Sequence, residues 1–235
     1  MNLVELLKLN IPLIEERLGY TFKNKELLVL AFVHRSFFNE NRELVAQHNE
    51  RLEFLGDSVL GLLVSDHLYR NMPSHAEGQL SYLKSRIVEA NSCGQFIQKL
   101  NVGEFVLLGR GERMNDGKGR ETILADLFEA LVGAMYVDGR MEAVIPFFQT
   151  KVVNELQLLI KDPVRNWKAE LQDYSQKKYQ KPPLYKVLQE TGPDHDKVFL
   201  ISAIVEDQEL GQGQGSSKKQ AEQAAAENAL SKING

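Results

Sequence analysis

The chain has 235 residues, of which 43% are hydrophobic and 26% are charged. These fractions are typical of a folded globular protein and exclude general disorder, and the length favours two domains over one. The N-terminus alternates apolar and charged residues and contains no long apolar run, so we expect no signal peptide, no membrane span and a cytoplasmic location. The single cysteine, Cys93, excludes an internal disulfide and a zinc cluster.

The net charge of −4 argues weakly against a nucleic-acid partner, because phosphate binding usually leaves a basic surface. The distribution of charge along the chain matters more than the net charge. From Pro163 onward acidic and basic residues are equal in number, so the acidic surplus lies entirely in the first part of the chain.

Apolar residues recur at helical spacing from residue 2 to about residue 160, in runs separated by short Gly, Asn or Pro breaks. This pattern predicts an all-α N-terminal domain over residues 1–160. Asp162-Pro163 then interrupts the helical run, because proline disfavours helix in the residue before it. We expect a short linker there.

Residues 163–233 predict a small α+β domain with the element order α-β-β-β-α. A helix is expected over 166–178, and the clearest strand has alternate apolar residues on one face, namely Phe199, Ile201, Ala203 and Val205. The stretch 211–215 is interpreted as a Gly-rich turn. The last helix carries a stripe that lets it dock closely on a sheet, formed by Ala221, Ala225, Ala229 and Ile233.

Two helical segments carry carboxylates among apolar residues. In HNERLEFLGDSVL, Glu50, Glu53 and Asp57 fall within one arc of roughly 60°, at about 100° per residue. In ETILADLFEALVGAMYVDG, Asp126 and Glu129 stand three residues apart and so share a face. No basic residue follows Asp57 or Glu129 at i+4 to pair with it.

Acidic pairs in charged helices are usually solvated faces. Here the apolar flanks predict mostly buried helices, in which two carboxylates about 4 Å apart repel by roughly 4 kcal/mol at an effective dielectric of 20. Such a cluster needs protonation or a cation. Mg²⁺ suits it, since it prefers hard oxygen ligands and keeps waters for chemistry, and Mn²⁺ can take its place. No HExxH or paired-His pattern supports zinc.

The motif HNERLEFLGD followed by LADLFEAL resembles the signature of bacterial ribonuclease III, and the α-β-β-β-α region resembles that family's double-stranded RNA-binding domain. The resemblance covers nearly the whole chain. It implies a metal site formed by Glu53, Asp57, Asp126 and Glu129, in which Asp57 and Glu129 are catalytic. Two further residues match accessory acidic positions of the family, Glu50 and Glu77, the latter in AEGQLSYLKS.

The resemblance also implies the reaction. The family hydrolyses phosphodiester bonds in double-stranded RNA with Mg²⁺, leaves 5′-phosphate and 3′-hydroxyl ends, and processes ribosomal RNA precursors and some messenger and transfer RNAs. Its homodimer cuts one strand with each subunit. The segment 52–64 is apolar on more sides than a surface helix needs, which fits either that dimer interface or a central core helix.

The start of the last helix is the predicted phosphate contact. Ser217 and Gln220 fit a capping box, and Lys218 and Lys219 place positive charge in the first turn, which opposes the helix dipole unless an anion binds there. Two solvated lysines are the simpler alternative. By resemblance, the other RNA contacts would come from Gln172, Lys168 and His195, the last in the loop 192–195.

Two other functions remain open at this point. A protein that kept the RNA-binding domain but lost catalysis would act as a scaffold or chaperone of duplex RNA, and loss of any of the four carboxylates would indicate it. None is lost. A nuclease acting mainly on DNA is disfavoured, because DNA lacks the 2′-hydroxyls that this type of domain contacts.

Overall fold

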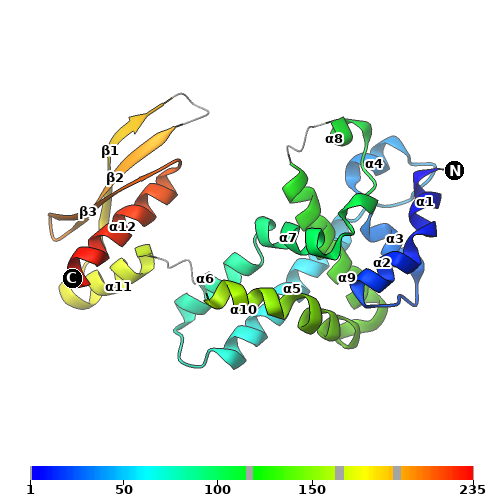
Figure 1. Cartoon of the computed structure of the whole chain (residues 1–235), viewed down its shortest axis with the longest axis horizontal. Helices are drawn as coiled ribbons and strands as arrows, with labels where there is room; N and C mark the ends of the chain where they lie inside the picture. Colours follow the sequence, from blue (N-terminus) through cyan, green and yellow to red (C-terminus); the bar gives the residue numbers. More distant parts are fainter. Residues whose placement is uncertain (1, 115–118, 162–166, 193–196, 235) are drawn as a thin grey trace. The chain divides into compact units, whose positions relative to one another are not determined.

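A computed structural model describes residues 2–114, 119–161, 167–192 and 197–234. They form two compact units, Met1–Pro163 and Val164–Gly235. The predicted fold class is confirmed, because the first unit is helical and the second has the order α-β-β-β-α (Figure 1). The linker expected at Asp162-Pro163 lies outside the described residues.

The first unit is built from short helices around two long ones. Its described helices are α1 (Leu3–Leu9), α2 (Ile11–Leu18), α3 (Lys25–Ala31), α4 (Arg35–Glu40), α5 (Glu50–Asn71), α6 (Glu77–Ile87), α7 (Ala90–Leu100), α8 (Arg110–Met114), α9 (Arg120–Phe147) and α10 (Val153–Lys161). A 3-10 turn covers Gly103–Phe105, and a π-helix over Phe148–Val152 joins α9 to α10. The one β-bridge among the described residues outside the sheet joins Val33 to Leu107.

Helices α5 and α9 form the centre of this unit and pack on each other more extensively than any other described pair. Helix α9 is buried along most of its length, whereas α5 buries one side and exposes the other. Helix α9 kinks at Gly139 and Arg140, whose φ and ψ angles are not helical. Asp138 holds the kink, since its carboxylate accepts hydrogen bonds from the Tyr20 hydroxyl at 2.6 Å and from the backbone N–H of Lys23 at 2.8 Å.

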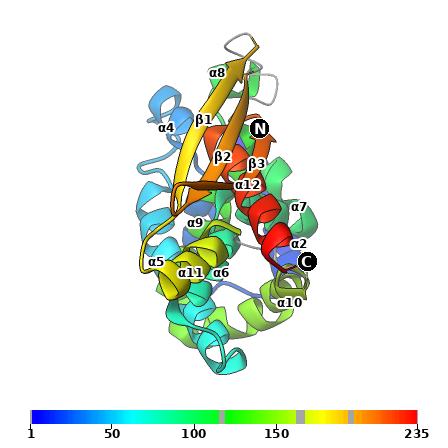
Figure 2. The same cartoon turned by 90° about the vertical axis from the view of Figure 1, so that its left-hand side faces the viewer.

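The second unit packs two helices, α11 (Trp167–Tyr179) and α12 (Lys218–Asn234), against a three-stranded antiparallel sheet (Figures 1 and 2). The strands β1 (Leu184–Thr191), β2 (Val198–Val205) and β3 (Gln208–Gly215) lie in the order β1-β2-β3. The predicted alternation in β2 is confirmed, because the buried residues facing the helices are Phe199, Ile201, Ala203 and Val205.

The Gly-rich stretch 211–215 is a strand, so its interpretation as a turn was wrong. It forms the last five of the eight residues of β3 and pairs with β2, for example Gly213 with Ile201. The glycines are needed for packing, because a Cβ at Gly213 would lie 2.0 Å from the backbone nitrogen of Ala225 in α12. The predicted alanine stripe is therefore confirmed, and its counterpart is a stripe of glycines on the strand.

Candidate active site

Two glycines set the distance between α5 and α9. A Cβ at Gly56 would lie 1.8 Å from the carbonyl oxygen of Glu129, and a Cβ at Gly133 would lie 2.1 Å from the carbonyl oxygen of Leu52. No other residue fits at either position without moving a helix backbone. The two helices therefore touch along the faces that carry the predicted carboxylates.

This contact brings the four predicted metal-site carboxylates together. Glu53 and Asp57 come from α5, one turn apart, and Asp126 and Glu129 come from α9. Asp57 is exposed, while the other three are half-buried among buried apolar residues. The cluster therefore opens to solvent on the side of Asp57 and is enclosed by protein on the other.

The pKa values show that these carboxylates lie within each other's electric field. Burial, followed by the charges of Asp57, Glu53 and Asp126 in that order, raises the pKa of Glu129 to about 7. Burial, followed by the charge of Asp126, raises the pKa of Glu53. Burial also raises the pKa of Asp126. Each of these pKa shifts is upward, as expected for a carboxylate in a poorly solvated, negatively charged site.

The donor set fits a hard divalent cation. Within the described residues none of the four carboxylates forms an ion pair with a Lys or Arg, although Lys84 lines the same pocket as Asp57 and the charge of protonated His34 lowers the pKa of Asp126. In the described chain no group of three or more acidic, His or Cys side chains is placed so that it could hold a metal ion. Mg²⁺ keeps several waters and uses few protein ligands, so it needs fewer than a full set of protein ligands. An open cluster of oxygen ligands is what it prefers.

The two accessory acidic residues differ in their placement. Glu50 begins α5, where Arg35 Nη1 lies 3.3 Å from its carboxylate, and its charge raises the pKa of Glu53 and of Asp126. Glu77 begins α6, is exposed, and accepts a hydrogen bond from the Ser81 hydroxyl at 2.8 Å. Its charge is not among the causes that shift the pKa of Glu53, Asp126 or Glu129. Within one chain the structure therefore brings Glu50 to the cluster and leaves Glu77 outside it.

Sequence reasoning missed three residues that shape this site. Gly56 and Gly133 were part of the motifs but were given no role, although their spacing on two apolar helices could have indicated a close crossing. His34 is the third. Its Nδ1 accepts from the backbone N–H of Ser36 at 3.2 Å, and burial lowers its pKa while the charges of Glu112 and Asp126 oppose that shift. A neutral imidazole thus stands beside the carboxylates.

The predicted RNA contacts lie on the helices of the second unit. Ser217 precedes α12, and its hydroxyl accepts from the backbone N–H of Gln220 at 3.3 Å, so the cap forms. The Gln220 side chain completes no box, because it bonds to the Ser216 hydroxyl instead, at 2.5 Å. Lys218 and Lys219 are both exposed in the first turn of α12.

The remaining residues predicted to contact RNA differ in their exposure and in their bonding to the protein. Gln172 is exposed on α11. Lys168 is half-buried, forms an ion pair with Glu222 at 2.5 Å, and lies 4.8 Å from the centre of the Tyr185 ring. It therefore ties α11 to α12 and is less free to meet a phosphate than the lysines of α12. His195 lies outside the described residues.

Comparison with known proteins identifies both units. Residues 24–156 match the family described as ribonuclease-III-like, and residues 167–233 match the double-stranded RNA binding motif. The ribonuclease 3 of Protochlamydia amoebophila is 60% identical over 99% of this chain and 96% of its own length. The chain belongs to the ribonuclease III family. The ribonuclease 3 of Borreliella burgdorferi is 44% identical over 92% of this chain and 88% of its own length.

The fold of the first unit also matches solved ribonuclease III structures. The nuclease domain from Campylobacter jejuni superposes with a TM-score of 0.53 at 35% identity, covering 60% of this chain and 96% of that chain. That structure is described as flexible in a region involved in dimer formation. This ribonuclease III is accordingly an endoribonuclease with a helical nuclease domain and a double-stranded RNA-binding domain.

Helix α5 of this ribonuclease III has one side in the core and one side exposed to solvent. One side is core, with Leu52, Val59, Leu60 and Val64 buried. The other side leaves large apolar residues in solvent, with Phe54 78%, Leu62 57% and Tyr69 75% exposed. These three fall on one side of the helix and form an apolar stripe that Ser58 and Ser65 interrupt. No helix of the described chain is long and apolar enough to cross a membrane.

Proposed function

We propose that this ribonuclease III hydrolyses double-stranded RNA with Mg²⁺, leaving 5′-phosphate and 3′-hydroxyl ends. The observation that supports this most is the convergence of Glu53, Asp57, Asp126 and Glu129 on two touching helices, where none of the four forms an ion pair with a Lys or Arg of the described residues. A cluster of this kind attracts a divalent cation and then a phosphate.

Glu53, Asp57, Asp126 and Glu129 would hold Mg²⁺, or Mn²⁺ in its place. The ion, when bound, supplies a water made more acidic and offsets negative charge on the phosphate. By holding the ion, the four side chains would set where the scissile phosphate lies against α5 and α9, with Asp57 on the solvent side. Hydrolysis adds a water oxygen to phosphorus and breaks the bond to the 3′ oxygen, which takes up the proton. Glu50 lies close enough to adjust the charge of the site.

The second domain delivers the duplex. The exposed Lys218 and Lys219, with the capped N-terminus of α12, would contact phosphates across a major groove, and Gln172 on α11 would reach an adjacent minor groove. Such contacts follow A-form shape over about 16 base pairs and carry little sequence preference. We infer that structured precursors of ribosomal RNA, and some messenger and transfer RNAs, are substrates in the cytoplasm.

The protein would act as a homodimer through α5, with each subunit cutting one strand. The stripe of Phe54, Leu62 and Tyr69 supports this, because exposed aromatic and aliphatic residues at regular helical spacing are typical of an interface. The stripe lies on the same helix as Glu53 and Asp57, so a dimer formed there brings two metal sites near one duplex. Glu77 of one subunit could then approach the site of the other.

The decisive experiment compares three substrates and two proteins. Duplex RNA, single-stranded RNA and duplex DNA are incubated with Mg²⁺ or with chelator, using the wild type and Glu129→Gln. We expect cleavage of duplex RNA alone, only with metal, and none by Glu129→Gln. Glu142→Gln is the matched control, since Glu142 is an exposed acidic residue on the same helix. Cutting in chelator, or equal cutting of all three substrates, would overturn the proposal.

A further inference from the structure

His34 lies next to the start of α5. The carbonyl of Val33, the residue before it, accepts from the backbone N–H of Asn49 at 2.9 Å, and Asn49 directly precedes α5. Arg35, the residue after it, places Nη1 3.3 Å from the carboxylate of Glu50, the first residue of α5. Contacts on both sides therefore fix the His34 backbone beside the helix that carries two of the four metal-site carboxylates.

The imidazole of His34 is held in one tautomer. Its Nδ1 accepts from the backbone N–H of Ser36 at 3.2 Å and lies 2.8 Å from the Ser36 hydroxyl oxygen. That hydroxyl accepts from the backbone N–H of Gly109 at 2.9 Å, so its own proton is free to be donated to Nδ1. A ring nitrogen that accepts a hydrogen bond carries no proton, so the proton of this ring is on Nε2. His34 is therefore a neutral side chain with a single N–H.

The Nε2–H of His34 is open and lies in negative surroundings. It makes no hydrogen bond within the part of the chain that the structure describes, and it is not among the buried polar atoms there that lack a partner, so solvent reaches it. Burial lowers the pKa of the ring while the charges of Glu112, Asp126 and Glu50 oppose that shift, so these carboxylates lie near it. The opposite charge nearby, on Arg35, is paired with Glu50. A donor without a partner thus stands beside the metal site, to which Asp126 belongs.

We propose that the Nε2–H of His34 donates a hydrogen bond to a non-bridging oxygen of the scissile phosphate. This role rests on the proposed cleavage of double-stranded RNA at the metal site. The phosphate oxygens carry the negative charge of the transition state, and a donor that is fixed in advance stabilises that charge without having to reorient. A neutral donor suits this place, because a lysine or arginine would pair with the carboxylates and compete with the metal ion for them.

The tautomer separates this role from that of a metal ligand. Histidine binds a metal ion through a ring nitrogen that carries no proton. In His34 that nitrogen is Nδ1, which already accepts from Ser36. Nε2 carries the proton and cannot bind the ion while this contact is in place. We therefore expect a change at His34 to alter the rate of hydrolysis and to leave the affinity of the protein for Mg²⁺ unaltered.

Two replacements divide the two functions of the ring. In His34→Gln the amide nitrogen can reach the position of Nε2 and keep the donor, whereas in His34→Asn the amide oxygen can take the position of Nδ1 and keep only the contact with Ser36. Cleavage of a short duplex RNA is followed in a single turnover, with the full chain and Mg²⁺ in excess. We expect His34→Asn to be at least about tenfold slower than wild type and His34→Gln to be within about threefold of it. A His34→Asn protein as fast as wild type, or a His34→Gln protein as slow as His34→Asn, would overturn the proposal.

A modified substrate tests the contact with the phosphate itself. The duplex carries sulfur in place of one non-bridging oxygen at the scissile position, in each of the two configurations, and sulfur accepts a hydrogen bond more weakly than oxygen does. Mn²⁺, a softer ion than Mg²⁺, is used so that the metal tolerates the sulfur. One configuration should slow wild type more than it slows His34→Asn, because the variant has no such hydrogen bond to lose. Equal slowing of both proteins by each configuration would contradict a contact between His34 and the phosphate.

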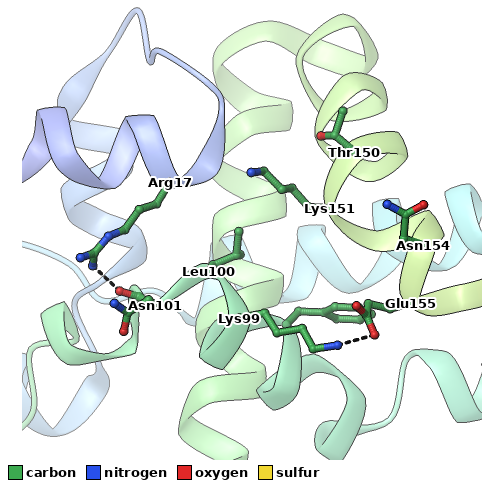
Figure 3. Close-up of a pocket in the computed structure, with 9 residues that line it drawn as sticks. Arg17, Lys99, Leu100, Asn101, Thr150, Lys151, Asn154 and Glu155 are labelled. Atoms are coloured by element: carbon green, nitrogen blue, oxygen red, sulfur yellow. Dashed lines mark hydrogen bonds and ion pairs between the residues drawn. The ribbon is translucent and has the colours of Figure 1, made fainter. Parts of the chain in front are cut away.

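Mg²⁺ affinity, measured by isothermal titration calorimetry on the full chain without RNA, should be the same for wild type and His34→Asn. Weaker Mg²⁺ binding by His34→Asn would show that His34 acts through the ion and would refute the assignment. Lys151→Ala is the control, since Figure 3 shows Lys151 on the π-helix at a pocket that none of the four carboxylates lines. It removes a charged donor and should change neither rate nor affinity. A wild type that cleaves no duplex RNA refutes the proposed function itself, whereas a cleaving wild type matched by His34→Asn refutes only the role of His34.

Discussion

Replacing Glu129 by Gln should abolish cleavage and, in the absence of metal, stabilise the nuclease domain. The reason is the pKa of Glu129, which burial and three neighbouring carboxylates raise from 4.5 to about 7. The folded protein therefore holds a proton that the unfolded chain releases between those two pH values. Stability supplied by the protonated group is present below pH 4.5 and is lost as pH rises through 7.

The size of the effect follows from the same pKa shift. At about 1.4 kcal/mol per pH unit, the ionised Glu129 destabilises the folded state at pH 8 by at most about 3 kcal/mol. Because the side chain is only half-buried, solvent screening reduces this to roughly 1–2 kcal/mol. Gln is neutral and nearly the same shape, so it removes this cost. For a domain of this length the midpoint should rise by roughly 2–8 °C.

Thermal unfolding of the full chain, followed by far-UV circular dichroism in chelator, measures this shift. Glu129→Gln should unfold at a higher temperature than wild type at pH 8 and at the same temperature near pH 4.5, while Glu142→Gln should match wild type at both. Mg²⁺ should raise the midpoint of wild type more than that of Glu129→Gln, since a ligand stabilises the state that binds it. Identical midpoints of wild type and Glu129→Gln at pH 8 would refute the reasoning.

Three further changes test the other parts of the molecule. Gly56→Ala should reduce cleavage about 100-fold, because its Cβ would lie 1.8 Å from the Glu129 carbonyl oxygen and must push α5 from α9. Changing Lys218 and Lys219 together to Ala should weaken duplex RNA binding. It should also reduce the magnitude of the slope of log affinity against log salt concentration by up to about two. Phe54→Asp should convert the proposed dimer to a monomer in a sizing measurement, since it places charge in the exposed apolar stripe.

Each of these has a matched control. Gly78→Ala adds a Cβ on α6 with no neighbour within 4 Å and should leave cleavage unchanged. Lys177→Ala removes an exposed lysine of α11 and should leave the salt slope close to that of wild type. Glu142→Gln alters an exposed residue of α9 and should not affect the dimer. An active Gly56→Ala enzyme, an unchanged slope, or a dimeric Phe54→Asp protein would each contradict the corresponding assignment.

The helical pattern and the element order could be predicted from the sequence because they depend on the spacing of apolar residues that are close along the chain. The alternation in β2 that ends at Val205 and the stripe in α12 that begins at Ala221 are both confirmed. Each arises because a single element packs one face against a single neighbouring layer. The stretch 211–215 was wrongly predicted as a turn because glycine is common in two settings. It occurs in turns, and it occurs in strands where another backbone packs closely against the sheet. Only the approach of α12, whose Ala225 nitrogen would meet a Cβ of Gly213, decides between them.

The site was predictable in its residue types and not in its geometry. Helical spacing indicated that Glu53 and Asp57 share a face, but no spacing rule relates them to Glu129, which is more than 70 positions away. That relation depends on the crossing at Gly56. For Lys168 the family pattern suggested a contact with RNA. In the structure its ammonium group forms an ion pair within the protein, with Glu222.

The helix crossing and the metal site depend on each other. Carboxylates on two helices repel, by roughly 4 kcal/mol for a pair about 4 Å apart at a dielectric of 20, and this force acts to separate α5 from α9. Burial of side chains such as Leu52 and Phe128 opposes it, since each fully buried apolar group contributes about 1.5–3 kcal/mol. The protein therefore holds its acidic residues together by apolar packing around Gly56 and Gly133. A cation removes the repulsion, so metal binding should tighten the same crossing that creates the site.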